Sequence, residues 1–235
     1  MFRFITKPIG LTPKQIQNNC KLNNYYHTGN LDVLAFGEML FISNRLRILE
    51  KFFKKLKKTY TFTLLAGFST DTHDILGIIT KIELKNNKIT KKSILEAINK
   101  IKQQQYQIPP KVSYKNLNTK AKLTNFLNGL PLKKLPPKKT KIIKINYISC
   151  TGVKKKNVIN SIFNQINYVT IPYRQNIIKK SYNKNYNNLP KIIYKYKFKA
   201  KVTSGFYIRA IARDLSKELN IPLTCINIKR EKIGF

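Results

Sequence analysis

The sequence predicts an α+β fold with a large mixed or antiparallel central sheet flanked by helices. Segments with alternating apolar residues, typical of half-buried strands, recur along the chain, as at residues 60–64 and 192–203. Helical segments fall between them irregularly, so the elements do not alternate as parallel β–α–β units. The length of 235 residues and a hydrophobic fraction of 42% allow a substantial core. We therefore expect residues 1–235 to form a single domain.

The first part of the chain is predicted to contain four strands and two helices. Thr12 is expected to cap a helix that ends near residue 22, because Pro13 follows at the first helical position. Apolar residues at helical spacing, with lysines opposite, predict a second helix over 45–57. Loops are expected at 23–37 and 69–77. The strands are expected at residues 2–6, 40–42, 60–64 and 78–84.

The second part is predicted to contain two long helices and three strands. Thr90 should cap a helix that ends near residue 102, and Pro109 and Pro110 should interrupt the chain after it. A short helix is expected at 119–128 and a basic extended arm at 132–141. The pattern weakens over 149–190, which we interpret as an Asn/Lys/Tyr-rich insertion. The remaining elements are strands at 142–148, 192–203 and 225–229 and a helix at 207–219.

The charge of the chain is strongly positive. There are 46 Lys and Arg residues against 10 Asp and Glu, a formal net charge of +36. A globular chain with this charge repels itself unless a polyanion offsets it, which favours a nucleic-acid partner over a membrane or a small substrate. Part of the excess is attributable to a composition rich in residues with AT-rich codons. The ten acidic residues are therefore the informative ones.

Cysteine and histidine usage argues against a metal centre. The three cysteines are far apart, and with only two histidines no zinc-ligand spacing occurs. The sparse, odd cysteine count suits a reducing compartment. No apolar run is long enough to span a bilayer, and the N-terminal residues read as folded sequence without a signal peptide. We expect a cytoplasmic protein without metal or cofactor.

One acidic residue stands out by its surroundings. The segment His27-Thr28-Gly29-Asn30-Leu31-Asp32 places a histidine, a glycine and a carboxylate in one loop. From the residues alone, Asp32 can be a surface ion-pair partner, a helix cap, or a nucleophile or base. Asp71 and Asp74 lie in another polar loop, where backbone hydrogen bonds are the expected role.

Several motifs occur in a fixed order along nearly the whole chain. Together they resemble the TruB family of tRNA pseudouridine synthases. The motifs are Lys7-Pro8-Ile9-Gly10, the His27–Asp32 loop, Lys58-Thr59-Tyr60, the Gly67–Gly77 loop, Gln107-Ile108-Pro109-Pro110, Ser204-Gly205-Phe206-Tyr207-Ile208-Arg209 and Lys229-Arg230-Glu231-Lys232-Ile233-Gly234. The sequence departs from the family pattern at Tyr26, Val33 and Phe36, and it shows no counterpart of the family's C-terminal RNA-binding PUA domain.

The resemblance implies the pseudouridine synthase catalytic fold and a set of site residues. Asp32 would be the catalytic carboxylate, Arg209 its ion-pair partner and Tyr60 the ring that stacks on the target base. The implied substrate-binding residues are His27, Tyr207, Lys58 and Lys7.

The implied substrate is tRNA, with the uridine at position 55 of the T-loop as the usual target, and no metal is implied. The basic segment around 105–140 would grip RNA phosphates. We expect a monomer. The alternative is a catalytically degenerate family member that acts as an RNA-binding or tRNA-folding chaperone. A basic ribosome-associated structural protein would explain the charge but not the ordered motifs.

Overall fold

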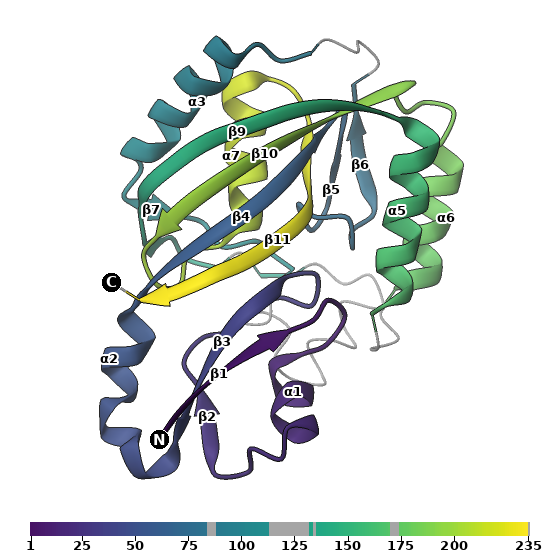
Figure 1. The fold of residues 1–235 in the computed structure, drawn as a ribbon. Helices are drawn as coiled ribbons and strands as arrows, with labels where there is room; N and C mark the ends of the chain where they lie inside the picture. The colour runs from purple at the N-terminus through teal and green to yellow at the C-terminus, as the bar shows by residue number, and fades with distance from the viewer. Residues whose placement is uncertain (84–87, 113–131, 134, 170–173, 235) are drawn as a thin grey trace.

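A seven-stranded mixed sheet forms the centre of the molecule (Figure 1). The computed structural model describes residues 1–83, 88–112, 132–133, 135–169 and 174–234. The strands of the sheet are β1 (Phe2–Lys7), β2 (Tyr25–His27), β3 (Phe36–Ser43), β4 (Lys57–Ala66), β9 (Ile142–Lys154), β10 (Ile192–Val202) and β11 (Leu223–Gly234). Their order is β1-β3-β11-β4-β10-β9, with β2 paired to β3. Only the β11–β3 pair is parallel among these described strands, so the predicted α+β class with a mixed sheet is confirmed.

Helices and two small hairpins surround this sheet. The helices are α1 (Pro13–Asn19), the 3-10 helix η1 (Asn44–Leu49), α2 (Glu50–Lys55), α3 (Lys91–Gln103), α5 (Lys155–Asn167), α6 (Gln175–Asn185) and α7 (Ile208–Leu219). The hairpins pair β5 (Phe68–Thr70) with β6 (Ile79–Ile82) and β7 (Tyr106–Gln107) with β8 (Lys138–Lys139). No helix in the described ranges is both long and apolar enough to cross a membrane.

Both predicted threonine caps are present. The Thr12 hydroxyl accepts a hydrogen bond from the Gln15 N–H at 3.2 Å, and the Gln15 side chain accepts one from the Thr12 N–H at 2.8 Å. This reciprocal capping box satisfies two N–H groups that the helix itself leaves without acceptors. Thr90 likewise accepts from the Ser93 N–H at 3.1 Å. These starts are local, which is why the sequence predicts them correctly.

The sheet carries a separate hydrophobic core on each face. In β4, Leu64 belongs to the core under α3 and α7, whereas the adjacent Leu65 belongs to the core under α5 and α6. Successive side chains of a strand point to opposite faces, so one buried strand serves both cores. Figure 1 shows α3 and α7 beside the long strands and α5 and α6 grouped at the far end of β9.

Two predicted segments differ in the structure. The helix expected over 45–57 is replaced by η1 and the short α2, because Leu46 has non-helical dihedrals and β4 already begins at Lys57. Its apolar spacing creates only a partial buried face: Leu56 is buried and Phe53 packs against the same cluster, whereas Phe52 is exposed. The weakly patterned stretch 149–190 is regular: it contains the end of β9, α5 and α6. The predicted helix at 119–128 lies outside the described residues.

Several strands are also longer than expected. β3 extends over Phe36–Ser43, β9 continues to Lys154, and β11 runs to Gly234. β9 follows β10 over almost its full length, and β11 follows β4 in the same way. A paired neighbour supplies backbone hydrogen-bond partners even where the residue alternation is weak.

The α5–α6 pair should be an integral part of the fold. Ile162 on α5 is fully buried, whereas Ile177 on α6 is 50% exposed. We expect Ile162→Ala to lower the free energy of unfolding by about 2–5 kcal/mol, because it leaves a cavity in the second core. Urea denaturation measures this. Ile177→Ala is the matched control and should change little; equal losses in the two variants would contradict the assignment.

Candidate active site

Two buried cations, Lys7 and Arg230, bind the backbone of the loop that carries Asp32. Lys7, at the end of β1, donates from Nζ to the carbonyl oxygens of Pro8, Leu11 and Val33 at 2.9, 2.8 and 3.4 Å. Arg230, on β11, donates from Nε to Glu38 O at 2.6 Å and from Nη1 to Asn30 O at 3.2 Å. The acceptor carbonyls of Asn30 and Val33 flank Asp32 on both sides. Charge-assisted hydrogen bonds therefore fix the backbone from which its carboxylate projects.

The burial of Lys7 perturbs its titration. Removal from water lowers the pKa of Lys7 from 10.5 to about 8, while the nearby Asp32 carboxylate opposes this shift. The side chain is fully buried, and its ammonium group donates hydrogen bonds to three carbonyl oxygens. This position favours a role in positioning the loop over the predicted direct contact with substrate, which stays a prediction.

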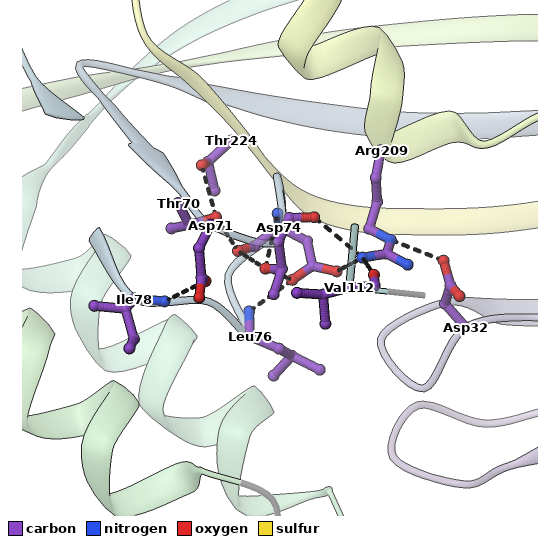
Figure 2. A network of polar contacts seen from close by, with 10 residues as sticks. Asp32, Thr70, Asp71, Asp74, Leu76, Ile78, Val112, Arg209 and Thr224 are labelled. Carbon is purple, nitrogen blue, oxygen red and sulfur yellow. Dashed lines mark hydrogen bonds and ion pairs between the residues drawn. The ribbon is translucent and has the colours of Figure 1, made fainter. Parts of the chain in front are cut away.

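Arg209 leaves the first turn of α7 and lies between two carboxylates (Figure 2). Its Nε donates to Asp32 Oδ2 at 2.8 Å, and its Nη1 lies 3.3 Å from Asp74 Oδ2. Nη1 also donates to the backbone oxygens of Thr72 and Val112 at 3.0 and 3.1 Å. The predicted partnership of Asp32 and Arg209 is thus present in the structure.

The two carboxylates differ in their access to solvent. The Asp74 side chain is 5% exposed, whereas that of Asp32 is 30% exposed. Asp32 Oδ2 is bound to Arg209, and Oδ1 has no hydrogen-bond partner within the described residues. One carboxylate oxygen is therefore oriented by the protein, and the other is available to a ligand.

Electrostatics keep the guanidinium of Arg209 charged. Burial alone lowers the pKa of Arg209, but the carboxylates of Asp32 and Asp74 outweigh it and raise the pKa above its ordinary value. Burial raises the pKa of Asp74, although Arg209 and a hydrogen bond from the Thr72 hydroxyl act in the opposite direction. Arg209 is therefore held as a cation by both carboxylates, of which Asp32 is the one that faces solvent.

The loop with Asp71 and Asp74 is internally hydrogen-bonded. Asp74 Oδ1 accepts from the Thr72 hydroxyl at 2.6 Å and from the Leu76 N–H at 3.0 Å. Asp71 accepts from the Ile78 N–H and pairs with Arg174, both at 2.8 Å. The predicted structural role of these acids is confirmed. The contact of Asp74 with Arg209 was missed, although the presence of two of only ten acids in this loop was an available signal.

The Gln107–Pro110 motif also has a role that was not predicted. The Gln107 amide donates to Tyr207 O at 3.2 Å and accepts from the Tyr207 N–H at 2.8 Å. These two bonds satisfy the backbone of the residue that caps α7. Arg213, one turn beyond Arg209, donates to Ile108 O at 2.8 Å. The segment from 107 to 112 thus fixes the start of the helix that carries Arg209.

The remaining predicted residues lie in different surroundings. Tyr60 is in the main core on β4 and is only 7% exposed. Lys58 is buried, with Nζ donating to the oxygens of Lys54, Leu56 and Ser204, and burial lowers its pKa to about 8. Tyr207 is partly buried at the start of α7. Contact of each of these side chains with substrate stays a prediction.

His27 stands at the end of β2, with its ring edge-to-face against Phe41 at a centroid distance of 6.2 Å. Burial lowers its pKa, and the nearby Lys54 and Arg230 lower it further. The imidazole is thus neutral near pH 7, and its buried Nδ1 has no hydrogen-bond partner among the described residues. A neutral ring next to the Asp32 loop is suited to stacking.

Solved structures with the same overall fold include two chains from RNA-associated complexes. A chain in a crystal structure of a Cbf5–Nop10–Gar1 complex superposes with a TM-score of 0.56 at 14% identity, over 99% of this chain and 48% of that one. A chain in an H/ACA RNP bound to a substrate RNA containing 2'-deoxyuridine gives 0.52 at 13% identity, over 99% and 47%. This chain therefore shares its fold with those two chains.

The sequence comparisons identify the family. The model of the TruB family pseudouridylate synthase N-terminal domain matches residues 17–165, and the chain belongs to this family. The tRNA pseudouridine synthase B of Aquifex aeolicus is 24% identical over 233 residues, covering 97% of this chain and 67% of the relative. That of Thermotoga maritima is 26% identical over 221 residues, covering 94% and 57%. The chain therefore spans between about half and two thirds of the length of these proteins.

The two carboxylates around Arg209 should differ in what they contribute to stability. We expect Asp74→Asn to lower the free energy of unfolding by about 3 kcal/mol, because the buried guanidinium of Arg209 loses one of its two carboxylate partners. Asp32→Asn, at the more exposed carboxylate, should cost about 1 kcal/mol or less. Urea denaturation compares them, with the exposed Glu96→Gln as the control. Equal losses at Asp74 and Asp32 would contradict the distinction.

Lys7 should produce a stability change at alkaline pH. Between about pH 8 and 10.5 the folded state holds this amine neutral while the unfolded state binds a proton. Stability rises with pH wherever the unfolded state binds more protons. From pH 8 to pH 10, the free energy of unfolding of wild type should therefore rise by about 2 kcal/mol relative to that of Lys7→Met. Urea denaturation across this range measures it. A flat difference, like that expected for the exposed Lys92→Met, would contradict the assignment.

Proposed function

We propose that this protein isomerises uridine to pseudouridine in tRNA, with Asp32 as the catalytic carboxylate. The observation that carries the proposal is the Asp32–Arg209 pair, in which one carboxylate oxygen is held at 2.8 Å and the side chain remains 30% exposed. Membership of the TruB family supports the same reaction. The relatives named tRNA pseudouridine synthase B support tRNA as the substrate.

The reaction breaks the glycosidic bond between N1 of uracil and C1' of ribose and forms a bond between C5 and C1'. The base rotates between these steps, and the proton from C5 is exchanged for one on N1, so no external reductant, oxidant or metal is required. Asp32 attacks the sugar or removes a proton from it; either route needs an ionised carboxylate. Arg209 orients Asp32 through a charge-assisted hydrogen bond.

The uridine must leave its stack to reach Asp32, as for other enzymes that act on a base. His27, with its neutral ring, would stack where the base leaves the RNA, and Tyr60 and Tyr207 would line the base pocket. Position 55 of the T-loop is the target we propose, since it is the usual substrate of the family that the motifs resemble. The basic segment around residues 105–140 would contact phosphates, and the proposed enzyme is cytoplasmic and monomeric.

A non-catalytic RNA chaperone is the competing function. It would need the basic surface but not a desolvated arginine aimed at a partly exposed carboxylate. The four contacts that hold Arg209 against Asp32, Asp74, Thr72 and Val112 therefore favour the enzyme.

Replacing Asp32 should separate catalysis from RNA binding. We expect Asp32→Asn to abolish isomerisation while RNA affinity stays within a few-fold, because the amide keeps the shape but not the charge. Since the product has the mass of the substrate, the readout is a carbodiimide adduct detected by primer extension on a tRNA transcript. Glu96→Gln, which removes an exposed carboxylate on α3, is the control. Turnover by Asp32→Asn would exclude Asp32 as the catalytic carboxylate. If wild type binds the RNA but leaves no modified uridine in it, the chaperone function is favoured.

A further inference from the structure

A second concave site lies away from Asp32, between the β5–β6 hairpin and the C-terminal half of α7. The cavity has a volume of about 300 Å³, at the lower end of the range for ligand pockets. Its walls include His73, Thr80 and Lys81 on the hairpin side and Arg213, Lys217 and Asn220 on the helix side. We refer to it as the hairpin–helix pocket.

The pocket is connected to the Asp32 site through α7. Arg209, Arg213 and Lys217 are spaced by four residues and therefore share one face of the helix. Arg209 serves Asp32, whereas Arg213 and Lys217 line the pocket. The rise between Arg209 and Lys217 is about 12 Å along the helix axis. The two sites thus lie on one rigid element.

The charges in the pocket are only partly compensated. All ten acidic residues of the chain fall in the described ranges, and none lines this pocket. Arg213 pairs through Nε with Asp214 at 2.8 Å. Lys81 and Lys217 form no ion pair with any of these ten acids, and both are exposed. Two lysines without an ion pair among the described residues therefore line one cavity.

Neutral donors complete the lining. The ring of His73 forms no hydrogen bond within the described residues, and neither does the side-chain amide of Asn220. Burial, together with the nearby cations Arg213, Arg209 and Lys217, lowers the pKa of His73 to about 4, so the ring is neutral near pH 7. Amide and imidazole N–H groups beside two lysines suit an anion with several acceptor oxygens.

We propose that the hairpin–helix pocket binds a phosphate group. The group comes from the backbone of the bound RNA, at some nucleotides' distance from the uridine at Asp32, or from a free phosphate anion. A surface lysine of this strongly basic chain would contribute only diffuse attraction. The pocket differs because its lysines and neutral donors line a single cavity large enough for the anion. The proposal relies on the proposed function only for the identity of the RNA.

The test uses the full chain and the double variant Lys81→Gln/Lys217→Gln. Its charge-matched control is Lys92→Gln/Lys184→Gln, which removes two exposed lysines of α3 and α6 outside the pocket. In the first arm, binding of a T-stem–loop RNA is measured against salt concentration. We expect the pocket variant to bind roughly tenfold more weakly, with a log–log salt slope smaller by about one unit, and the control to stay within about threefold of wild type.

The second arm titrates inorganic phosphate by NMR or calorimetry. A loss confined to the RNA arm, or a loss in both arms, assigns the pocket to an RNA phosphate. Saturable phosphate binding that only the pocket variant loses, without an effect on RNA, assigns it to a free anion. If the pocket variant matches the control in both arms, the proposal is overturned. Denaturation midpoints verify that both variants fold, and isomerisation is assayed separately, so failure of the catalytic proposal remains distinguishable.

Discussion

The guanidinium of Arg209 is the constraint on which the rest of the site depends. A buried cation is costly to remove from water unless it is paired and hydrogen-bonded. Arg209 obtains this compensation from three segments far apart in the sequence, which contribute Asp32, then Thr72 and Asp74, and finally Val112. The pairing therefore requires that two loops and the segment after Pro110 meet at the start of α7. The contacts that stabilise the buried Arg209 charge are therefore the same contacts that assemble the site.

The buried cations near the Asp32 loop are held by backbone oxygens because the chain has few carboxylates. With ten acids against 46 bases, most cations cannot find a carboxylate. The buried Lys7, Lys58 and Arg230 instead donate chiefly to backbone oxygens. Carbonyl acceptors hold a charged side chain without neutralising it. The buried cations thereby fix the loops without drawing on Asp32 or Asp74 as hydrogen-bond partners.

The accuracy of the sequence-based predictions follows the range of the interactions. The caps at Thr12 and Thr90 are decided within four residues and were predicted correctly. The helix expected over 45–57 is present only in part: it is interrupted by the non-helical dihedrals of Leu46 and ends at Lys55, where no local pattern predicted a break. The irregular stretch expected over 149–190 forms α5 and α6, whose Ile162 and Tyr182 pack into the second core. These helices have a mostly polar composition, and their narrow apolar face becomes evident only when it packs against the sheet.

The printed sequence alone was enough to predict the α+β class, the capped helix starts at Thr12 and Thr90, and the family to which Asp32, Tyr60 and Arg209 point. These follow from periodicity, composition and ordered motifs, which are properties of the chain read in one dimension. The folded chain was needed to show that Asp74 shares Arg209 with Asp32, that Gln107 binds the backbone of the α7 cap residue, and that Lys7 lies buried beside the loop. Each of these is a contact between residues distant in sequence, and no local pattern specifies which buried charge will meet which partner.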